Sequence, residues 1–536
     1  MDSNNIERIY RLTPMQEGML YHKLLDEQST SYFVQNVIEL TGDVRLDFIK
    51  ASLQLLTKKH SVLRTKIFYR KIKDPRQIVL KHEEIGVRSL DFRHFSVQEQ
   101  EEQLEQLKKQ DVQQGFDLEK DVLMRVIVVR LSESTYKMIW SFHHIIMDGW
   151  CMSLVVKDFM AYYDELIKGK QLEALTREVE DSSRSLAKYE EYIQWLSKQN
   201  KNKALHYWKE LLQDYSNDAK LGLGYKRPDP VDTQICQTSI KLEKDLNDKL
   251  SALAVQLQVT ENTIVEAAWG ILLQRLTGEK DVVFGKVVSG RNANIRGIEE
   301  VVGLFINTIP VRVENKQETK VQELVHTLQA QAVESGQYDY CSLPEIQAQS
   351  QLKGNLMQSI LAFENYYADN EPQQFGGLSF QVEDLIEQTN YPLSFIVFPE
   401  ETLRFEIMHD PNEYSQEEIE HILRNMQNII EKMVEKPDEK VNQLDVILPE
   451  DQKQIIDAFN PAATTYPKEK PIHTLWLEQV QRYPEREAVV TADERVSYAE
   501  LEQRANQLWG ELQRTGVKSG SLIGIVTEKS VDMVAG

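Results

Sequence analysis

The chain has 536 residues, of which 41% are hydrophobic and 27% charged, and its formal net charge is −22. Single hydrophobic cores stop growing at roughly 250–300 residues, so this length predicts a globular protein with more than one core. The acidic balance argues against a nucleic-acid partner, because the average field of the protein would repel a phosphate backbone.

Cysteine usage and apolar patterning indicate the compartment. Cys151, Cys236 and Cys341 are far apart and have no metal-ligand spacing. Sparse cysteines in a long chain suit a reducing compartment. The first residues contain no apolar signal core, and no run of about 18 apolar residues occurs in the chain. We therefore expect a cytoplasmic protein with no membrane partner.

The first third of the chain mixes helix and strand patterns. Residues 48–59, "FIKASLQLLTKK", have helical spacing, and residues 97–114 predict a charged helix. The segments "VLMRVIVVRL" (122–131) and "YKMIWSFH" (136–143) predict two strands joined by a short polar turn. A helix with one apolar face is predicted from Gly149 to Lys168.

A second mixed unit follows a polar connector. It contains a strong helix pattern, "NTIVEAAWGILLQRLTG" (262–278), and strand patterns at 281–290 and 403–410. Helices and strands alternate here without a strict βαβ order, which favours α+β lobes over a doubly wound sheet. The Pro/Ala/Thr-rich stretch "DAFNPAATTYPKEKP" (457–471) predicts a linker. A new pattern begins at His473 and stops before it is complete, so we expect a truncated domain.

The stretch "IWSFHHIIMDGW" (139–150) places two histidines and a carboxylate at the end of a buried strand. Neighbouring side chains on a strand face opposite sides, so His143 and His144 should point in different directions. Asp148 follows where the strand has ended, and Gly149 permits a close backbone approach or a positive φ. A structural interpretation stays open, with hydrogen-bonded core histidines and Asp148 as a helix N-cap.

A metal site and a cysteine nucleophile have less support from the sequence. A metal site would need a third ligand of recognisable spacing beside His144 and Asp148, and the sequence offers none. A nucleophile would have to be Cys151, which is close in sequence but directed along the predicted helix.

The pattern HHxxxDG, formed by His143, His144, Asp148 and Gly149, resembles the signature of nonribosomal peptide synthetase condensation domains. Chloramphenicol-type acetyltransferases share the core of this motif. Further segments resemble the other motifs of the condensation family in the family's order, with some drift at Cys341 to Pro344. They are "LTPMQEGMLYH" (12–22), "KHSVLRTKIF" (59–68), "YEEYIQWLSKQ" (189–199), "ALHYWKELL" (204–212), "FGKVVSGR" (284–291), "VVGLFINTIPVRV" (301–313), "YDYCSLPEIQ" (338–347) and "FENYYADN" (363–370). The resemblance covers about residues 8–450.

The resemblance implies an α+β fold, an α/β sandwich built as two chloramphenicol-acetyltransferase-like lobes in a V-shaped pseudo-dimer with a tunnel between them. It implies transfer of an aminoacyl or peptidyl group from a donor thioester to the amine of an acceptor aminoacyl thioester. An upstream donor and a downstream acceptor carrier protein would present these substrates on 4′-phosphopantetheine arms. No cofactor is expected to bind directly.

The resemblance also implies roles for the motif residues. His144 is expected to be catalytic, either as the base or as the group that orients the amine. An imidazole, with an ordinary pKa of about 6.5, can accept a proton at neutral pH, and a positioned base contributes about 10²–10⁴-fold. His143 would support it, and the backbone N–H of Gly149 would stabilise the oxyanion.

Asp148 is expected to be structural and paired with an arginine, with Arg291 as the first choice and Arg64 as the second. No metal is expected. Three further residues are expected to line the tunnel: Trp150, Ser289 and Asn307.

The order of segments narrows the type of condensation domain. Heterocyclising relatives carry aspartates in place of the two histidines, and both histidines are present here. Residues 473–512 resemble the start of an adenylation domain, and this order of domains disfavours an epimerising condensation domain. The form "LTPMQEGML" resembles the subtype that accepts D-configured donors. "FGGLSF" (375–380) superficially resembles a carrier site, but its flanks predict a hairpin.

The expected organisation includes a docking segment for the C-terminal tail of an upstream synthetase. The expected limits are 1–12 for this segment, 13–175 and 176–450 for the two lobes, 451–472 for a linker and 473–536 for the truncated adenylation piece. Two alternatives remain: a CoA-dependent acyltransferase of the chloramphenicol acetyltransferase type, and a non-catalytic platform that binds carriers.

Overall fold

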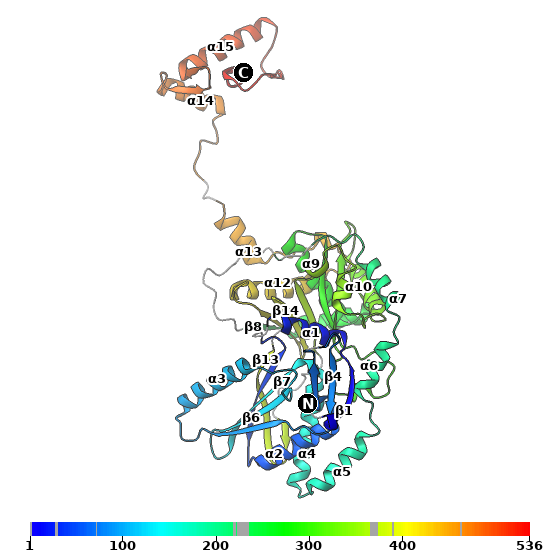
Figure 1. Cartoon of the computed structure of the whole chain (residues 1–536). Helices are drawn as coiled ribbons and strands as arrows, with labels where there is room; N and C mark the ends of the chain where they lie inside the picture. The colour runs from blue at the N-terminus through cyan, green and yellow to red at the C-terminus, as the bar shows by residue number, and fades with distance from the viewer. Residues whose placement is uncertain are drawn as a thin grey trace. The chain divides into compact units, whose positions relative to one another are not determined.

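The computed structural model describes residues 3–26, 30–70, 72–217, 221, 235–364, 373–387, 391–460 and 464–536 (Figure 1). Two compact units are present, Met1–Leu448 and Pro449–Gly536. Parts of several sequence-based expectations lie outside the described residues, including 1 and 2 of the docking segment, 365–370 of the motif "FENYYADN", 461–463 of the linker and short stretches of both expected lobes.

A six-stranded sheet forms the centre of the first lobe, in the order β12-β13-β2-β7-β6-β5. The β2–β7 pair is antiparallel and places Phe33 opposite His143. The strands are β2 (Phe33–Thr41), β5 (Gly86–Asp91), β6 (Met124–Arg130), β7 (Thr135–His143), β12 (Gln373–Phe375) and β13 (Leu378–Glu387). Their apolar side chains join the first lobe's core, which includes the fully buried Trp140.

Helices α2 and α4 pack against each other and contribute to the same core (Figure 1). Helix α3 begins with a capping box between Ser96 and Glu99, so its charged sequence forms a well-defined helix. The helices that precede the strands of the second lobe along the chain are α1 (Pro14–Leu25), α2 (Leu46–Lys59), α3 (Val97–Gln114), α4 (Gly149–Ile167), α5 (Leu172–Ser183), α6 (Tyr189–Ser197) and α7 (Lys201–Leu211).

The segment expected to dock an upstream synthetase is partly built into the fold. Residues Ile6–Arg11 form β1, the first strand of a three-stranded sheet β1-β4-β3. Strand β1 pairs with β4 (Arg76–Leu80), which pairs with β3 (Thr65–Phe68). Residues Ile6–Arg11 therefore belong to a sheet of the first lobe, with one edge of β1 paired to β4, and a docking role for residues 1–12 stays a prediction.

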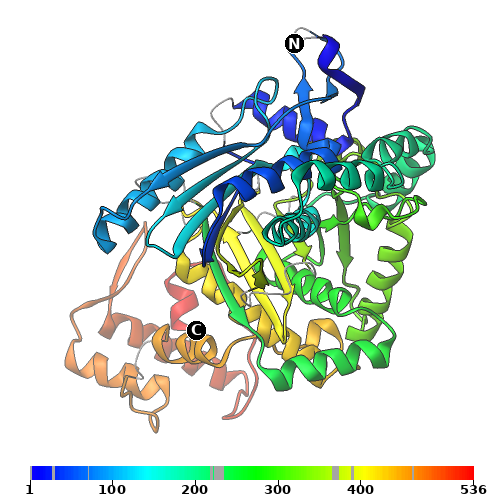
Figure 2. The same ribbon diagram turned by 90° about the horizontal axis from the view of Figure 1, so that it is seen from below.

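The second lobe has its own six-stranded sheet, in the order β10-β9-β11-β14-β15-β8. Its strands are β8 (Cys236–Lys241), β9 (Asp281–Val288), β10 (Asn307–Glu314), β11 (Ser359–Phe363), β14 (Leu393–Pro399) and β15 (Leu403–His409). Its helices are α8 (Lys244–Leu257), α9 (Glu261–Thr277), α10 (Val321–Ser335), α11 (Leu343–Gln347) and α12 (Gln416–Glu435). The sheets of both lobes can be followed from below in Figure 2.

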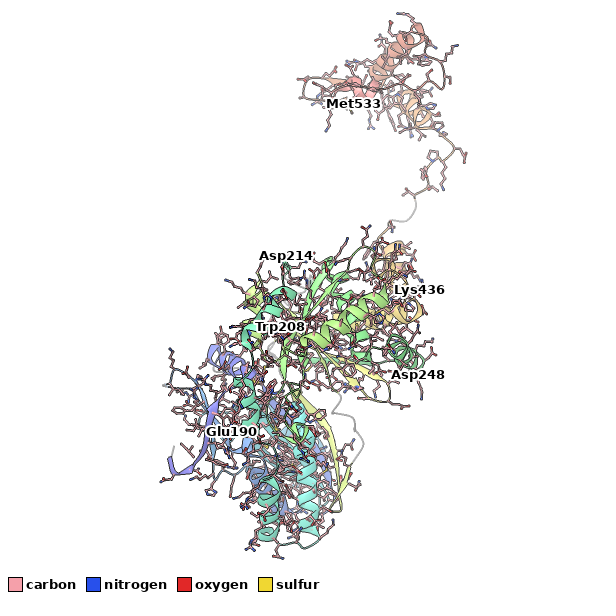
Figure 3. The ribbon with its side chains drawn as sticks, turned by 90° about the vertical axis from the view of Figure 1, so that its right-hand side faces the viewer. Glu190, Trp208, Asp214, Asp248, Lys436 and Met533 are labelled. Carbon is pink, nitrogen blue, oxygen red and sulfur yellow. The ribbon has the colours of Figure 1, made fainter. Side chains whose placement is uncertain are left out.

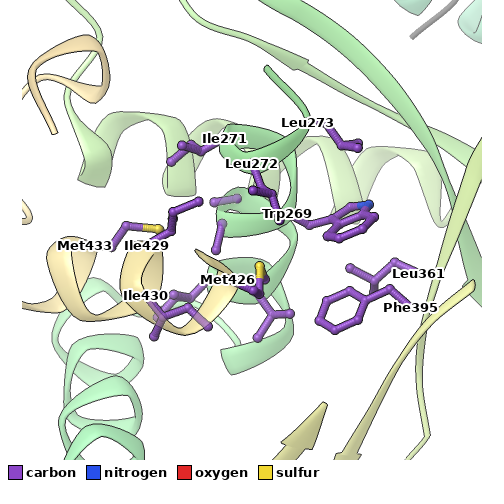
Figure 4. Close-up of a cluster of buried hydrophobic side chains, with 14 of the residues drawn as sticks. Trp269, Ile271, Leu272, Leu273, Leu361, Phe395, Met426, Ile429, Ile430 and Met433 are labelled. Atoms are coloured by element: carbon purple, nitrogen blue, oxygen red, sulfur yellow. The ribbon is translucent and has the colours of Figure 1, made fainter. Parts of the chain in front are cut away.

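The core of the second lobe lies between its sheet and the helices α9 and α12. Trp269 of α9 stacks on Phe395 of β14 at 4.9 Å between ring centroids, beside Met426 of α12 (Figure 4). A neighbouring cluster contains the fully buried Trp208 of α7 (Figure 3). Two lobes with mixed sheets and helices confirm the predicted α+β class.

The chain returns to the first lobe late in its course. Strands β12 and β13 follow β11 of the second lobe, yet β13 pairs with β2 of the first. The expected second lobe over 176–450 is therefore not continuous in space. The same segment forms the hairpin predicted for "FGGLSF", with Gly376 and Gly377 between the paired strands.

The unit Pro449–Gly536 has a small core around Val496, Leu501 and Val531. Trp476 stacks on Tyr498 at 4.9 Å. Its elements are α13 (Pro449–Lys453), α14 (Ile472–Arg482), the paired strands β16 (Glu487–Val490) and β17 (Arg495–Ser497), α15 (Tyr498–Arg514) and α16 (Val531–Ala535). Within the described parts of the chain, no helix combines the length and apolar character needed to cross a bilayer.

Candidate active site

His143 ends strand β7 and supports the turn that follows. Its Nδ1 accepts a hydrogen bond from the backbone N–H of Ile145 at 3.1 Å. The ring is buried, and burial, with His144 as a smaller cause, lowers the pKa of His143 to about 3. A neutral ring is therefore retained at ordinary pH, so that Nδ1 remains an acceptor.

His144 leaves the sheet and faces a cavity. Its backbone N–H donates to the carbonyl oxygen of Tyr32 at 2.8 Å, and it begins a short 3₁₀ turn, His144–Ile146. The side chain lines a cavity of about 1010 Å³, which Gly149 also lines. The two histidines thus have different surroundings, as strand alternation predicts.

Both lobes contribute to this reaction cavity. The first lobe supplies α1 and the turn after β7, and the second supplies parts of β9, β10, β11, β14 and β15. Apolar residues that line the cavity include Met15, Met19, Val287, Ile306, Met357, Ile360, Ile396 and Met408. The charged pair Lys201 and Glu345 also lines the cavity. Such a mostly apolar space with a few polar groups is typical of a substrate site.

Asp148 is fully buried and is the N-cap of α4. Its Oδ1 accepts from the backbone N–H of Cys151 at 3.3 Å and lies 3.3 Å from Nη2 of Arg291. Its Oδ2 accepts from the backbone N–H of Phe305 at 2.9 Å. The carboxylate therefore joins the start of α4 to a loop of the second lobe.

Arg291 fixes the same loop from the other side. Its Nη1 donates to the carbonyl oxygens of Ile298 at 2.6 Å and Val301 at 2.9 Å. The guanidinium also lies over the ring of Phe305, 4.1 Å from its centroid. Arg64, the second choice for a partner of Asp148, lies elsewhere: it pairs with Glu7 at 2.8 Å.

Cys151 is part of this contact as a protonated thiol. Burial, and secondarily Asp148, raise the pKa of Cys151 well above its usual value. Its Sγ lies 3.1 Å from Oδ1 of Asp148 and 3.1 Å from the carbonyl oxygen of Gly303, so either oxygen can accept the one thiol proton. A neutral buried thiol is a poor nucleophile, so its environment assigns Cys151 a structural role.

Two glycines serve different purposes at the site. Gly149 is the first residue of α4, where backbone N–H groups lack acceptors within the helix. Gly149 begins the helix without the positive φ that the sequence left open for it. Gly290 does, with φ 64°, and a Cβ there would lie 1.8 Å from the carbonyl oxygen of Phe305. The close approach of these two backbones therefore requires glycine next to Arg291.

Of the three residues expected to line the tunnel, only Asn307 lines the reaction cavity. Its Nδ2 donates to the carbonyl oxygens of Asp339 and Cys341, each at 2.6 Å. Ser289 lines a different cavity, of about 530 Å³. Trp150, which does not line the reaction cavity, donates from Nε1 to the carbonyl oxygen of Glu299 at 3.0 Å. Ser289 and Trp150 therefore do not line the reaction cavity, and their place in a tunnel stays a prediction.

The sequence reasoning missed Tyr32, which lines the cavity and bonds to the backbone of His144. Nothing in the sequence indicates its position, because it depends on a backbone angle. His22 belongs to the motif "LTPMQEGMLYH", but the motif alone did not identify it as a cavity residue.

Comparisons with known proteins show the family to which the chain belongs. A family model described as a condensation domain matches residues 6–456, and one described as an AMP-binding enzyme matches residues 476–536. Bacitracin synthase 3 of Bacillus licheniformis is 36% identical over 540 residues, covering 99% of this chain and 8% of the relative. Gramicidin S synthase 2 of Brevibacillus brevis is 36% identical over 537 residues, covering 99% and 12%. The chain therefore spans 12% or less of the length of these two relatives.

Solved structures share the fold at low sequence identity. A four-domain nonribosomal peptide synthetase bound to AMP and glycine has a TM-score of 0.70 and 18% identity, covering 96% of this chain and 39% of that one. The first condensation domain of the CDA synthetase has a TM-score of 0.60 and 16% identity, covering 83% and 100%. These likenesses confirm the fold of two lobes that the sequence resemblance predicts.

Proposed function

This chain belongs to the condensation-domain family. From this premise we propose that its first unit transfers a carrier-bound aminoacyl or peptidyl group to the amine of a carrier-bound aminoacyl acceptor, which forms an amide bond. The observation that supports the reaction most directly is His144, which faces a cavity lined by both lobes. A donor carrier and an acceptor carrier would each insert a 4′-phosphopantetheine arm. Holding two tethered reactants together supplies a large effective concentration.

His144 is the proposed base. The acceptor nitrogen attacks the thioester carbon, a C–N bond forms, and the π electrons move onto the oxygen. His144 accepts the proton that the nitrogen loses. The C–S bond then breaks, and the leaving thiolate takes this proton to become the free thiol. The products are an amide on the acceptor arm and a thiol on the donor arm.

Asp148 and Arg291 are proposed to position this base without contacting the substrate. They fix the start of α4 and the loop that ends at Phe305. Gly149 is proposed to donate its N–H to the oxyanion, because the first N–H groups of a helix stabilise negative charge. The motif "LTPMQEGML" supports a D-configured donor.

The experiment that tests this function supplies the full chain with two separately loaded carrier proteins. Donor carriers with D- and L-aminoacyl groups are combined with a panel of acceptor carriers, and mass spectrometry identifies new amides on the acceptor. We expect amide only when both carriers are present. Turnover of acyl-CoA and a free amine without carriers would instead support the CoA-dependent alternative, and no product from any pair would refute the proposal.

A further inference from the structure

Tyr32 has a backbone conformation that bulky residues avoid. Its φ is 67°, in the left-handed region, directly before strand β2. Such a conformation is an outlier for a large side chain and persists only where the surrounding structure holds it. Glycine would adopt the same angle without strain. The presence of tyrosine therefore calls for a role of its side chain.

The backbone of Tyr32 fixes the position of His144. Its carbonyl oxygen accepts the N–H of His144 at 2.8 Å, and the next residue, Phe33, lies opposite His143. Tyr32 thus stands where the pairing of β2 with β7 ends and His144 turns into the cavity. A displacement of this carbonyl would displace the imidazole.

Tyr32 lines the same cavity as His144 and Gly149. Its ring centroid lies 6.1 Å from that of His22, which lines the cavity from α1. Burial, with Tyr391 as a smaller cause, raises the pKa of Tyr32. Its hydroxyl therefore keeps its proton and remains a hydrogen-bond donor at neutral and moderately alkaline pH.

We propose that Tyr32 is a further catalytic residue of the condensation site, whose phenol donates a hydrogen bond to the thioester oxygen while its own carbonyl positions His144. This inference rests on the proposed function. As the acceptor nitrogen attacks, the electron pair that moves onto the oxygen strengthens the bond from the phenol. The bond weakens again when the C–S bond breaks and the carbonyl re-forms. An interaction that is stronger in the tetrahedral state than in the substrate accelerates the reaction.

The test is Tyr32→Phe in the full chain, which keeps the ring and removes only the hydroxyl. Loss of one donor to an oxyanion lowers kcat by about 10²–10³-fold. We expect a loss of this size, an unchanged KM for the acceptor carrier and an unchanged shape of the pH–rate profile. The control is Tyr466→Phe, because Tyr466 does not line the reaction cavity and has 66% of its surface exposed. Its kcat should match that of the wild type.

Three results would overturn the role of Tyr32. If kcat of Tyr32→Phe stays within threefold of the wild type, the phenol does not act in the reaction. If only KM rises, Tyr32 shapes substrate binding and does not stabilise the transition state. If the wild type forms no amide with any pair of carriers, the proposed function fails and this role fails with it. Only the first two results leave the proposed function intact.

Discussion

Removing the carboxylate of Asp148 should destabilise the first unit strongly. Asp148 is fully buried, and the side chain of Arg291 is 8% exposed. Asp148→Ala would leave this guanidinium without its counter-ion and two backbone N–H groups, of Cys151 and Phe305, without their carboxylate acceptor. Breaking a buried pair by removing one partner costs about 3–5 kcal/mol. We expect the free energy of unfolding of this unit to fall by about that amount.

Urea unfolding of the full chain measures this change, and hydrogen exchange in peptides covering 144–152 and 298–306 assigns it to the first unit. The matched control is Asp47→Ala, because the Arg45–Asp47 pair has side chains that are 49% and 60% exposed. An exposed pair contributes about 0–1 kcal/mol. In a protein that already carries Arg291→Met, Asp148→Ala should lower the free energy of unfolding by less than it does in the wild type, because it leaves no buried charge without a partner.

Two results would refute this reasoning. One is a loss for Asp148→Ala no larger than that for Asp47→Ala. The other is a loss of unfolding free energy in the double variant, Asp148→Ala with Arg291→Met, that equals the sum of the losses in the two single variants. Either would show that the buried contact adds nothing to the stability of the unit.

Three further predictions concern pH and backbone geometry. Burial raises the pKa of Asp339 to about 6, above its ordinary 3.8, so its stabilising contribution is complete below pH 3.8 and is lost as pH rises through 6. Asp339→Asn should therefore be more stable than the wild type at pH 8, by roughly 2–3 kcal/mol, and not at pH 3.5; equal differences at both pH values in urea unfolding would contradict this. The pH dependence due to His143 has the opposite sign, because its pKa in the folded protein, about 3, lies below the ordinary 6.5. The wild type should therefore lose stability relative to His143→Gln as pH falls from 6.5 towards 3. Parallel curves of stability against pH for the two proteins would contradict this. Gly290→Ala should cost at least about 2 kcal/mol in thermal unfolding, because its Cβ would meet the carbonyl of Phe305, whereas Gly18→Ala, with nothing within 4 Å, should be neutral or stabilising; similar melting temperatures for the two variants would refute the steric argument.

Local patterns predicted the elements around the site well. The helix expected from 97–114 is Val97–Gln114, and the one expected from Gly149 to Lys168 is Gly149–Ile167. The expected strand 136–143 is Thr135–His143. These elements follow from side-chain periodicity and from capping residues such as Ser96, which are properties of the neighbouring sequence.

Contacts between distant segments do not follow from periodicity. The pairing of Asp148 with Arg291 was expected only through the family resemblance. The return of β13 to the first lobe depends on pairing with β2, which no local pattern encodes. Ser289 follows β9 and lines a different cavity from His144, and this position depends on the turn made there by Gly290. The position of Tyr32 depends on a positive φ, which tyrosine does not indicate.

The rate of a single turnover, measured with pre-loaded carriers for the wild type and for His144→Ala, tests the central claim most directly. The account predicts that His144→Ala forms the amide about 10²–10⁴-fold more slowly, while its unfolding curve stays close to that of the wild type. The side chain of His144 lines the cavity, so its loss should leave the buried contact between Asp148 and Arg291 in place. A folded His144→Ala protein that forms the amide at the wild-type rate would contradict the account.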